Sequence, residues 1–336
     1  MLLGLTLTIV AGVLGGSVLA PIKRMRRWPF HNSWAVYSLW AYFIMPWVVG
    51  FATVPGLLSI YPQVSLRTAL ICGLSGFGWG FAVVLFGVAV NLAGLTLASA
   101  IIYGASVAVG SLSPLLISHP ERLATAQGAL IVAANAVMVA GIVLSALAGK
   151  VRDSGGGERA AAGTADPRRF ARGLAASLAA AILSSLFNIA LAYGSEFNRL
   201  AIAAGASPWN AANAQWAFTV SFGYLPNLAV SLVVLRRERA WRIYSEGPAS
   251  HWIWPPLMGF MWIGGTALYG SGAGALGSLG PVIGWPIYMS MMIIAGSFWG
   301  WVTGEWEHAP RRALVLLAGG IVVQIVAISM LSAVNR

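Results

Sequence analysis

Charged side chains are scarce in this sequence. Only 9 of its 336 residues are Asp or Glu, and residues of both charges together make up 9%. A soluble domain has about 25% charged residues, so this composition excludes an ordinary soluble protein. Cysteine is scarcer still. Cys72 is alone, so no disulfide can form within the chain, and we expect its thiol to be buried and inert.

The motifs of common enzymes are also missing. The Ser-Gly-Gly-Gly-Glu stretch at 154–158 lacks the Lys-Ser/Thr pair of a phosphate-binding loop, and no serine lies in a nucleophile-elbow pattern. The four histidines lie in joins or at the ends of apolar runs, without the spacing of a metal site: His31, His119, His251 and His308. We therefore expect no enzymatic activity, no metal and no cofactor.

Long apolar runs dominate what is present. Hydrophobic residues make up 58% of the chain, and the mean hydropathy is +0.79. A run of about 20 apolar residues forms a helix long enough to cross a bilayer core of roughly 30 Å. Ten such runs predict a polytopic protein in contact with the lipid bilayer. The expected spans are 1–20, 34–54, 68–90, 93–116, 125–148, 172–195, 208–235, 251–271, 281–303 and 311–332.

Basic residues predict the orientation of these spans. Most of the 20 Lys and Arg residues lie in the joins that follow odd-numbered spans, beginning with Lys23, Arg24, Arg26 and Arg27 after the first. Because cytoplasmic loops are enriched in Lys and Arg, we expect these joins in the cytoplasm and both termini in the periplasm of a bacterial inner membrane. The formal charge of +11 belongs to these joins, so we expect no nucleic-acid partner.

Two segments indicate an internal repeat. Residues 76–94 align without gaps with 259–277, with identities at Gly76/Gly259, Phe77/Phe260, Trp79/Trp262, Leu85/Leu268, Gly87/Gly270 and Gly94/Gly277, and with Phe86 opposite Tyr269. Five spans per half would give the halves opposite orientations, the plan of many secondary transporters. The fold class expected is therefore an all-α membrane protein with ten transmembrane helices in a 5+5 inverted repeat. The repeats are 1–148 and 172–336, joined by a flexible cytoplasmic linker at 149–171.

Several spans carry polar and aromatic residues at helical spacing. Such stripes must face other helices or water, since lipid would leave their polar groups unsatisfied. One interpretation is hydrogen bonding between packed helices. The other is a cavity whose aromatic faces and neutral polar groups bind a sugar. The candidate substrate-binding residues are Asn188, Trp262, Tyr269, Trp285, Tyr288, Trp79, Tyr103, Trp216 and Asn213.

Glu196 is the acid closest to such a stripe, at the outer end of the sixth span. A carboxylate at membrane depth often relays protons, so Glu196 is a candidate for proton coupling. The alternative is a solvated glutamate, or one paired with Arg199.

The chain resembles the L-rhamnose–proton symporter family of the drug/metabolite transporter superfamily over nearly its whole length. The resemblance is carried by APIKRMRRW at 20–28, the GFGW…G…G run at 76–94, FMW at 260–262 with Tyr269, and GEWEHAPRR at 304–312. It implies ten spans, a 5+5 inverted repeat and proton-coupled uptake of a sugar across the inner membrane. The chain departs from the family pattern at Gly265 and Pro281, where the resemblance implies an amide and an acid.

Three interpretations of function follow. The first is a secondary transporter that takes up L-rhamnose or a related deoxysugar by alternating access, with protons. The second is an exporter of metabolites or drugs, as in other branches of the superfamily. The third is a non-transporting membrane scaffold or receptor, for which we would expect a packed interior without a cavity.

Overall fold

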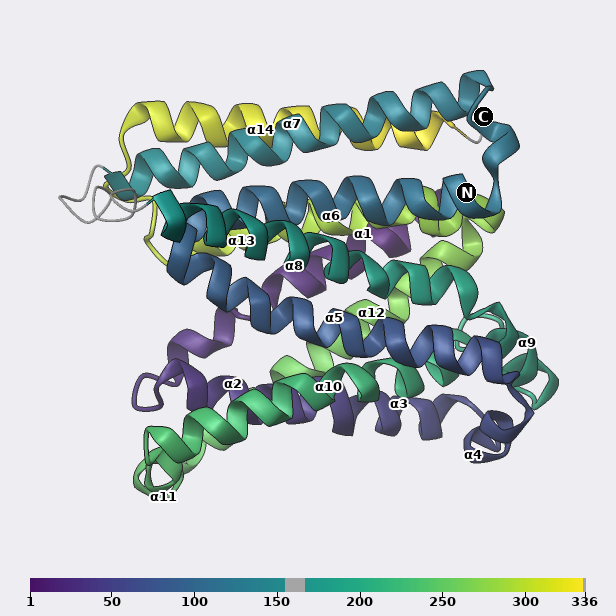
Figure 1. Cartoon of the computed structure of the whole chain (residues 1–336), viewed down its shortest axis with the longest axis horizontal. Helices are drawn as coiled ribbons and strands as arrows, with labels where there is room; N and C mark the ends of the chain where they lie inside the picture. The colour runs from purple at the N-terminus through teal and green to yellow at the C-terminus, as the bar shows by residue number, and fades with distance from the viewer. Residues whose placement is uncertain (155–166, 335–336) are drawn as a thin grey trace.

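The computed structural model describes residues 1–154 and 167–334 of the chain, and this part is helical without a strand. Long helices lie side by side in one bundle (Figure 1). They are α1 (Leu2–Ser17), α2 (Phe30–Leu39) continued by η2 (Trp40–Ile44) and α3 (Met45–Thr53), α5 (Leu66–Ala93), α6 (Leu95–Ser118), α7 (Ala126–Ser154), α8 (Pro167–Tyr193), α10 (Ala212–Arg237), α12 (Trp254–Ala275), α13 (Gly280–Val302) and α14 (Arg311–Ala333).

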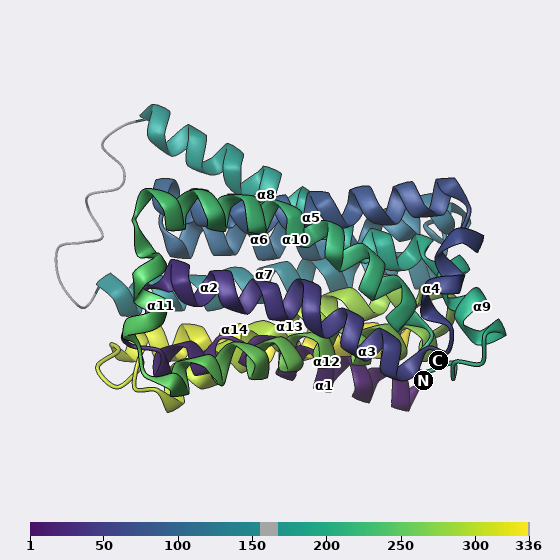
Figure 2. The same cartoon turned by 90° about the horizontal axis from the view of Figure 1, so that it is seen from below.

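Short helical turns connect the long helices. They are η1 (Ala20–Arg24), α4 (Leu57–Ile60), η3 (Tyr61–Gln63), η4 (Pro120–Arg122), α9 (Ser195–Ala203), η5 (Ala240–Arg242), α11 (Ile243–Glu246), η6 (Ala249–Trp252) and η7 (Gly277–Leu279). Figures 1 and 2 show α4 and α9 at the end of the bundle that holds both termini, with α11 at the opposite end. We call the end with α11 the basic end, because the basic joins after α1, α10 and α13 lie there.

In the described part of the chain, nine helical segments are long and apolar enough to cross a membrane. The protein is therefore an all-α membrane protein, as the sequence predicts. The long helix outside this set is α12, whose many glycines and two prolines lower its hydropathy. One whole side of α12 is nevertheless buried against neighbouring helices, so its sequence reflects contact with protein more than contact with lipid.

The second predicted span is interrupted rather than straight. Its helix begins at Phe30, four residues earlier than predicted, and passes through the π-helical turn η2 before α3. Pro46 explains this turn because proline has no N–H to donate to the carbonyl of Tyr42. The Met45 N–H instead bonds the carbonyl of Trp40, one residue further back than in an α-helix. Tyr42 lies within this turn and is buried.

The tight hairpin predicted between the third and fourth spans is present, with its pivot at Gly94 rather than at Asn91 and Leu92. Gly94 separates α5 from α6 and has a φ of 84°. This left-handed backbone is cheap for glycine and costly for other residues, so one residue suffices to reverse the chain.

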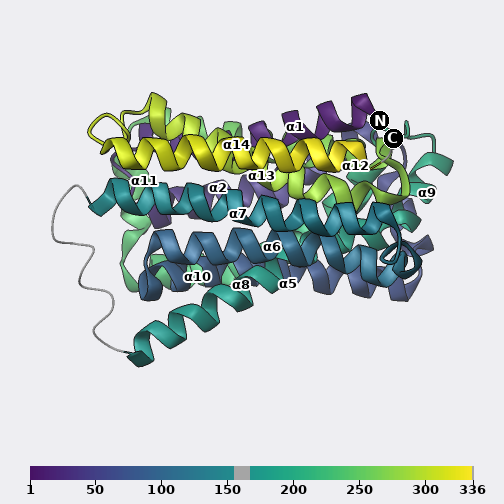
Figure 3. The same cartoon turned by 90° about the horizontal axis from the view of Figure 1, so that it is seen from above.

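The long helices pack in a definite pattern. α5 lies against α8 and α10, while α12 lies against α1 and the interrupted second span. The α5–α10 crossing is very close, since a Cβ at Gly76 would stand 1.9 Å from the carbonyl oxygen of Thr219. At the α12 crossing, a Cβ at Gly259 would stand 2.9 Å from the Cβ of Trp40. α7 and α14 pair along one outer face (Figure 3).

The predicted linker at 149–171 lies mainly outside the described residues, at 155–166. Its two described ends are helical, since α7 continues to Ser154 and α8 begins at Pro167. The amino-terminal turns of α8 project from the bundle at the basic end (Figures 2 and 3).

Candidate functional site

A cavity of about 460 Å³ occupies the centre of the bundle. Its size falls within the roughly 300–1,000 Å³ typical of small-molecule sites. Its walls come from α1, α2, α5, α6, α8, α10, α12 and α13. Leu19, Phe30, His31 and Val234 line the mouth, and they lie near the helix termini at the basic end. The cavity therefore opens toward that end.

Aromatic rings form the inner wall of the cavity. The ring centroid of Tyr42 lies 5.0 Å from those of both Trp79 and Trp262, and these two tryptophans lie 5.6 Å from each other. Phe187 closes the group, with its centroid 5.1 Å from that of Trp79. Edge and tilted contacts of this kind hold the rings in fixed orientations, so this wall of the cavity is aromatic and rigid.

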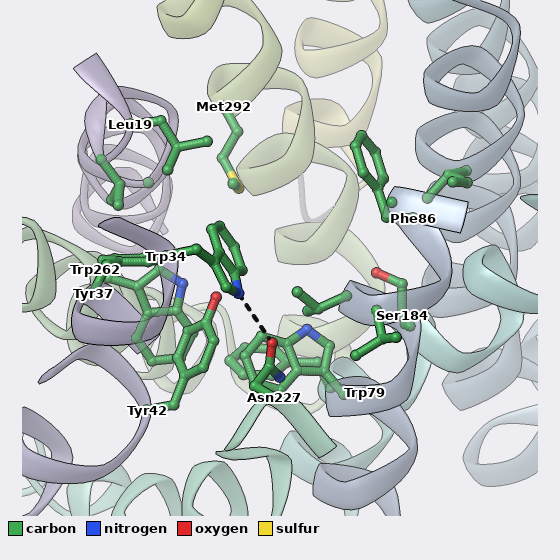
Figure 4. Close-up of a pocket in the computed structure, with 18 of the residues that line it drawn as sticks. Leu19, Trp34, Tyr37, Tyr42, Trp79, Phe86, Ser184, Asn227, Trp262 and Met292 are labelled. Carbon is green, nitrogen blue, oxygen red and sulfur yellow. Dashed lines mark hydrogen bonds between the residues drawn. The ribbon is translucent and has the colours of Figure 1, made fainter. Parts of the chain in front are cut away.

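Few polar groups interrupt these aromatic walls. The non-aromatic side chains with hydrogen-bonding atoms are Ser184, Asn227 and Ser231, and His31 adds a titratable ring at the mouth. Figure 4 shows Asn227 between Trp79 and Trp34, with the indole Nε1 of Trp34 donating to Asn227 Oδ1 at 3.3 Å. Among the described residues, the lining contains no Asp, Glu, Lys or Arg. The cavity thus suits a neutral ligand with an apolar face.

Five of the predicted substrate-binding residues line this cavity: Trp79, Tyr103, Trp262, Trp285 and Tyr288. They come from two pairs of consecutive helices, α5 with α6 and α12 with α13, and the two pairs are far apart in the sequence. Trp285 is anchored by a hydrogen bond from its Nε1 to the carbonyl of Ser106 at 2.9 Å. Its ring lines the end of the cavity opposite the mouth, which we call the floor.

Asn188 and Tyr269 lie behind this floor instead of in the cavity lining. The Asn188 amide donates to the carbonyls of Gly110 at 2.8 Å and Pro281 at 2.9 Å, and its Oδ1 accepts from the Tyr269 hydroxyl. Tyr269 is fully buried and stacks on Tyr288, with ring centroids 4.8 Å apart. These two residues tie α6, α8, α12 and α13 together, as the helix-packing interpretation expects.

Trp216 and Asn213 on α10 also lie outside the lining. Trp216 is fully buried and stacks on Phe187, with ring centroids 4.7 Å apart and an interplanar angle of 12°. Asn213 donates to Thr53 Oγ1 at 3.0 Å, nearer the end of the bundle that holds the termini. Together with the Asn188 network, these residues separate the cavity from that end.

Glu196 lies far from the cavity, at the amino terminus of α9. Its carboxylate accepts from the Ser65 hydroxyl at 2.6 Å and from the Ser65 backbone N–H at 3.1 Å. The hydrogen bond from the Ser65 side chain is the main cause of a lowered pKa for Glu196, with a further contribution from Thr68. An exposed carboxylate that fastens α9 to the start of α5 gives no geometric support to the predicted role in proton coupling.

Sequence patterns did not single out Tyr42, Phe187 or Asn227 as site residues. Asn227 belongs to the polar stripe of the seventh span, and this stripe is the signal that could have identified it. Tyr42 reaches the centre through the π-helical turn, and Phe187 is an apolar ring in an apolar span. Neither carries a pattern that distinguishes a cavity residue from a core residue.

A second cluster of side chains lies at the basic end. Lys23 and Arg152 both bond the Glu305 carboxylate, with Arg152 Nη1 3.0 Å from Oε2, and the Arg152 guanidinium lies 4.7 Å from the centroid of the Trp306 ring. Burial raises the pKa of Glu305, but the hydrogen bond and charge of Lys23, with Arg152, outweigh this effect and hold the pKa below its usual value. The cluster fastens η1 and α7 to the join between α13 and α14.

No group of three or more potential metal ligands occurs among residues 1–154 and 167–334. An all-helical bundle with apolar outer faces and a central, neutral, aromatic cavity open at one end is the architecture expected of a membrane transport protein. A family model described as L-rhamnose-proton symport protein (RhaT) matches residues 1–334. The chain therefore belongs to the L-rhamnose-proton symport protein family, which consists of transporters and not enzymes.

Curated relatives share this name over most of their length. The L-rhamnose-proton symporter of Cronobacter sakazakii is 25% identical over 333 residues, which cover 97% of this chain and 95% of the relative. The L-rhamnose-proton symporters of Escherichia coli and Shigella boydii are each 24% identical over 316 residues, covering 92% of this chain and 90% of each relative. The family resemblance predicted from the sequence is confirmed.

Proposed function

We propose that this protein takes up L-rhamnose or a related deoxysugar together with protons, across a bacterial inner membrane. The observation that carries the proposal is the family match over residues 1–334, combined with a neutral aromatic cavity of suitable size. Sugars pair well with such walls because their C–H surfaces lie against ring faces while their hydroxyls find a few polar groups. The open cavity gives no support to the scaffold interpretation, which requires a packed interior.

The proposed architecture is ten spans in two inverted repeats, 1–148 and 172–336. The helix contacts support this repeat. When each of the first five long helices is matched in order with one of the last five, several observed contacts correspond to other observed contacts. The α5–α8 and α6–α8 contacts become α12–α1 and α13–α1, and α5–α10 becomes the contact of α12 with the second span. Trp79 and Trp262, which occupy aligned repeat positions, face each other across the centre.

The aligned glycines add a physical reason for the repeat. Gly76 and Gly259 each lie where a helix of one half crosses a helix of the other at very close range. A glycine is required at both crossings for the same steric reason. We propose that the basic joins face the cytoplasm and that both termini are periplasmic, because the basic end gathers the Lys and Arg residues.

The proposed mechanism is alternating access around the central aromatic group. The cavity is open at the basic end and is separated from the other end by Trp216, Tyr269 and the Asn188 network. In the alternative state, the floor would open and the mouth would close, so that a bound sugar passes between the two sides. The five predicted residues Trp79, Tyr103, Trp262, Trp285 and Tyr288 would contact the sugar, and Asn188, Tyr269, Trp216 and Asn213 would form the closed end.

Transport of labelled L-rhamnose into proteoliposomes, with and without an inward proton gradient, tests this proposal. We expect gradient-stimulated uptake by the natural protein. The Trp262→Ala variant should raise the KM about tenfold or more, because it removes an aromatic face worth roughly 1.5–3 kcal/mol when covered. Trp301→Ala is a matched control, since Trp301 is 66% exposed on the outside of α13. Absence of uptake of any sugar under either condition would refute the proposal.

A further inference from the structure

We propose that Trp34 and Asn227 form the hydroxyl-recognition pair of the cavity, and that one sugar hydroxyl binds between them. The hydroxyl would accept a hydrogen bond from the Trp34 indole N–H and donate one to Asn227 Oδ1. This assignment rests on the proposed function, since it names the polar contact through which a sugar is selected. Neither residue was among the substrate-binding candidates predicted from the sequence.

The orientation of the Asn227 amide is fixed by its surroundings. Its Nδ2 donates to the backbone carbonyls of Gly223 at 3.1 Å and Gly80 at 3.3 Å. Carbonyl oxygens can only accept, so the amino group must face them and Oδ1 must face the other way. With both amino hydrogens used, Asn227 offers the cavity an acceptor and no donor. The side chain is 2% exposed, which holds this acceptor rigid.

The bond between Trp34 and Asn227 is one that a ligand can replace. Its Nε1–Oδ1 distance of 3.3 Å exceeds the usual value of roughly 2.9–3.0 Å, so the direct bond is weak, and little is lost when the Trp34 ring moves aside to admit a hydroxyl at hydrogen-bond distance from both atoms. A carbonyl oxygen has two lone pairs, and an indole offers one donor. A hydroxyl both donates and accepts, so it satisfies both partners at once, whereas a ligand without it leaves the long direct Trp34–Asn227 bond in place and gains no hydrogen bond there.

The position of the pair beside the aromatic walls strengthens the assignment. Asn227 and Trp79 both line the cavity, and Figure 4 shows the two side chains near each other. The Trp34 ring stacks on the exposed Phe30, with centroids 5.6 Å apart, so this contact leaves Trp34 free to move with Phe30. A sugar whose C–H face covers Trp79 therefore has its edge, where hydroxyls project, directed at Trp34 and Asn227.

The test is binding of L-rhamnose and its single-position deoxy or fluoro analogues to the purified full-length protein by isothermal titration calorimetry. For the natural protein, we expect one analogue, which lacks the bridging hydroxyl, to bind about tenfold more weakly than L-rhamnose. Trp34→Phe keeps the ring and removes the donor. This variant should bind L-rhamnose about tenfold more weakly, yet bind that one analogue as the natural protein does.

A matched control is available in the same two spans. Trp47 Nε1 donates to Ser221 Oγ at 2.8 Å, which also joins the second span to α10, but neither residue lines the cavity. Trp47→Phe should leave the ranking of the analogues and their affinities unchanged. Asn227→Ala should reproduce the selectivity change of Trp34→Phe. If this variant does not fold because the α5–α10 crossing is loosened, Trp34→Phe alone decides the matter.

The outcomes separate the inference from the proposed function. Suppose that the natural protein binds L-rhamnose, but that Trp34→Phe lowers the affinity for L-rhamnose and all analogues equally, or lowers no affinity. The proposed hydroxyl bridge is then wrong, while the proposed sugar transport stands. If the natural protein binds no sugar at all, both are wrong. Loss of selectivity for one hydroxyl position, in Trp34→Phe and not in Trp47→Phe, supports the bridge.

Discussion

Single glycine residues set how closely the two halves approach. At Gly76 an added methyl group would meet the Thr219 carbonyl oxygen at 1.9 Å, and a backbone atom cannot turn aside as a side chain can. We predict that Gly76→Ala destabilises the protein by about 1–3 kcal/mol, because α5 and α10 must separate to admit the methyl group. The thermal unfolding midpoint in detergent, followed by intrinsic fluorescence, measures the effect.

Gly264 on α12 is the matched control. It is also a helical glycine in a long apolar helix, but no atom lies within 4 Å of the position that a Cβ would take. Gly264→Ala should therefore leave the unfolding midpoint unchanged or raise it slightly, since alanine has the higher helix propensity. Equal midpoints for the two variants would show that the close crossing is not required for stability.

At the same scale, the sequence predicted the aromatic half of the candidate cavity better than its amide groups. Trp262 and Trp285 were identified because polar and aromatic residues recur at helical spacing, and Trp79 aligns with Trp262 between the two similar segments. Helical spacing shows which face of a helix a residue occupies, but not what lies opposite that face. Asn188 was therefore expected in the cavity although backbone carbonyls surround it, while Asn227, on an equally polar stripe, borders the open space.

Between elements, the cluster around Glu305 fastens the basic end. Lys23 comes from η1 and Arg152 from α7, while Glu305 lies between α13 and α14. The pKa of Glu305 is held below its usual 4.5. The cluster therefore contributes stability that is fully present above pH 4.5 and is lost as the pH falls through the lowered value. We predict that Glu305→Gln lowers stability at pH 7 by about 1 kcal/mol, since solvent screens this partly exposed group.

Thermal unfolding of the natural protein and of Glu305→Gln between pH 7 and pH 3 checks this prediction. The difference between their midpoints should be largest at neutral pH and should shrink below pH 4.5. Glu246→Gln is the control, because its partner Arg242 stands 3.6 Å away on the exposed α11 turn and joins no separate helices. A difference for Glu305→Gln that stays constant down to pH 3 would contradict the prediction.

The course of the elements was largely predictable, because apolar runs and basic joins are strong local signals. The interruption of the second span was not predicted, although Pro46 is visible in the sequence. A proline in an apolar run is compatible with a kink, a π-helical turn or a break, and the neighbouring helices decide between them. The lowered hydropathy of α12 has a similar cause, since contact with α1 and the second span replaces contact with lipid.

For the whole molecule, the important feature is an asymmetry between the two aligned segments of the proposed repeat, 76–94 and 259–277. Gly87 and Gly270 occupy aligned repeat positions. A Cβ at Gly87 would meet nothing within 4 Å, whereas one at Gly270 would stand 2.8 Å from Trp216 Nε1. The segment around Gly270 is thus tightly packed, whereas the aligned segment around Gly87 borders open space. No pattern in a single sequence predicts this, because the proposed repeat is compatible with either end being open.

The asymmetry predicts which aligned positions a water-soluble reagent reaches. Val83 lines the cavity and Thr266, its aligned counterpart, is fully buried. The natural Cys72 is buried, so background labelling will be low. We predict that a membrane-impermeant maleimide labels Val83→Cys from the cytoplasmic side, in inside-out vesicles but not in spheroplasts, and that it labels Thr266→Cys from neither side. If Thr266→Cys reacts as fast as Val83→Cys, or Val83→Cys reacts only in spheroplasts, the proposed open end or orientation is wrong.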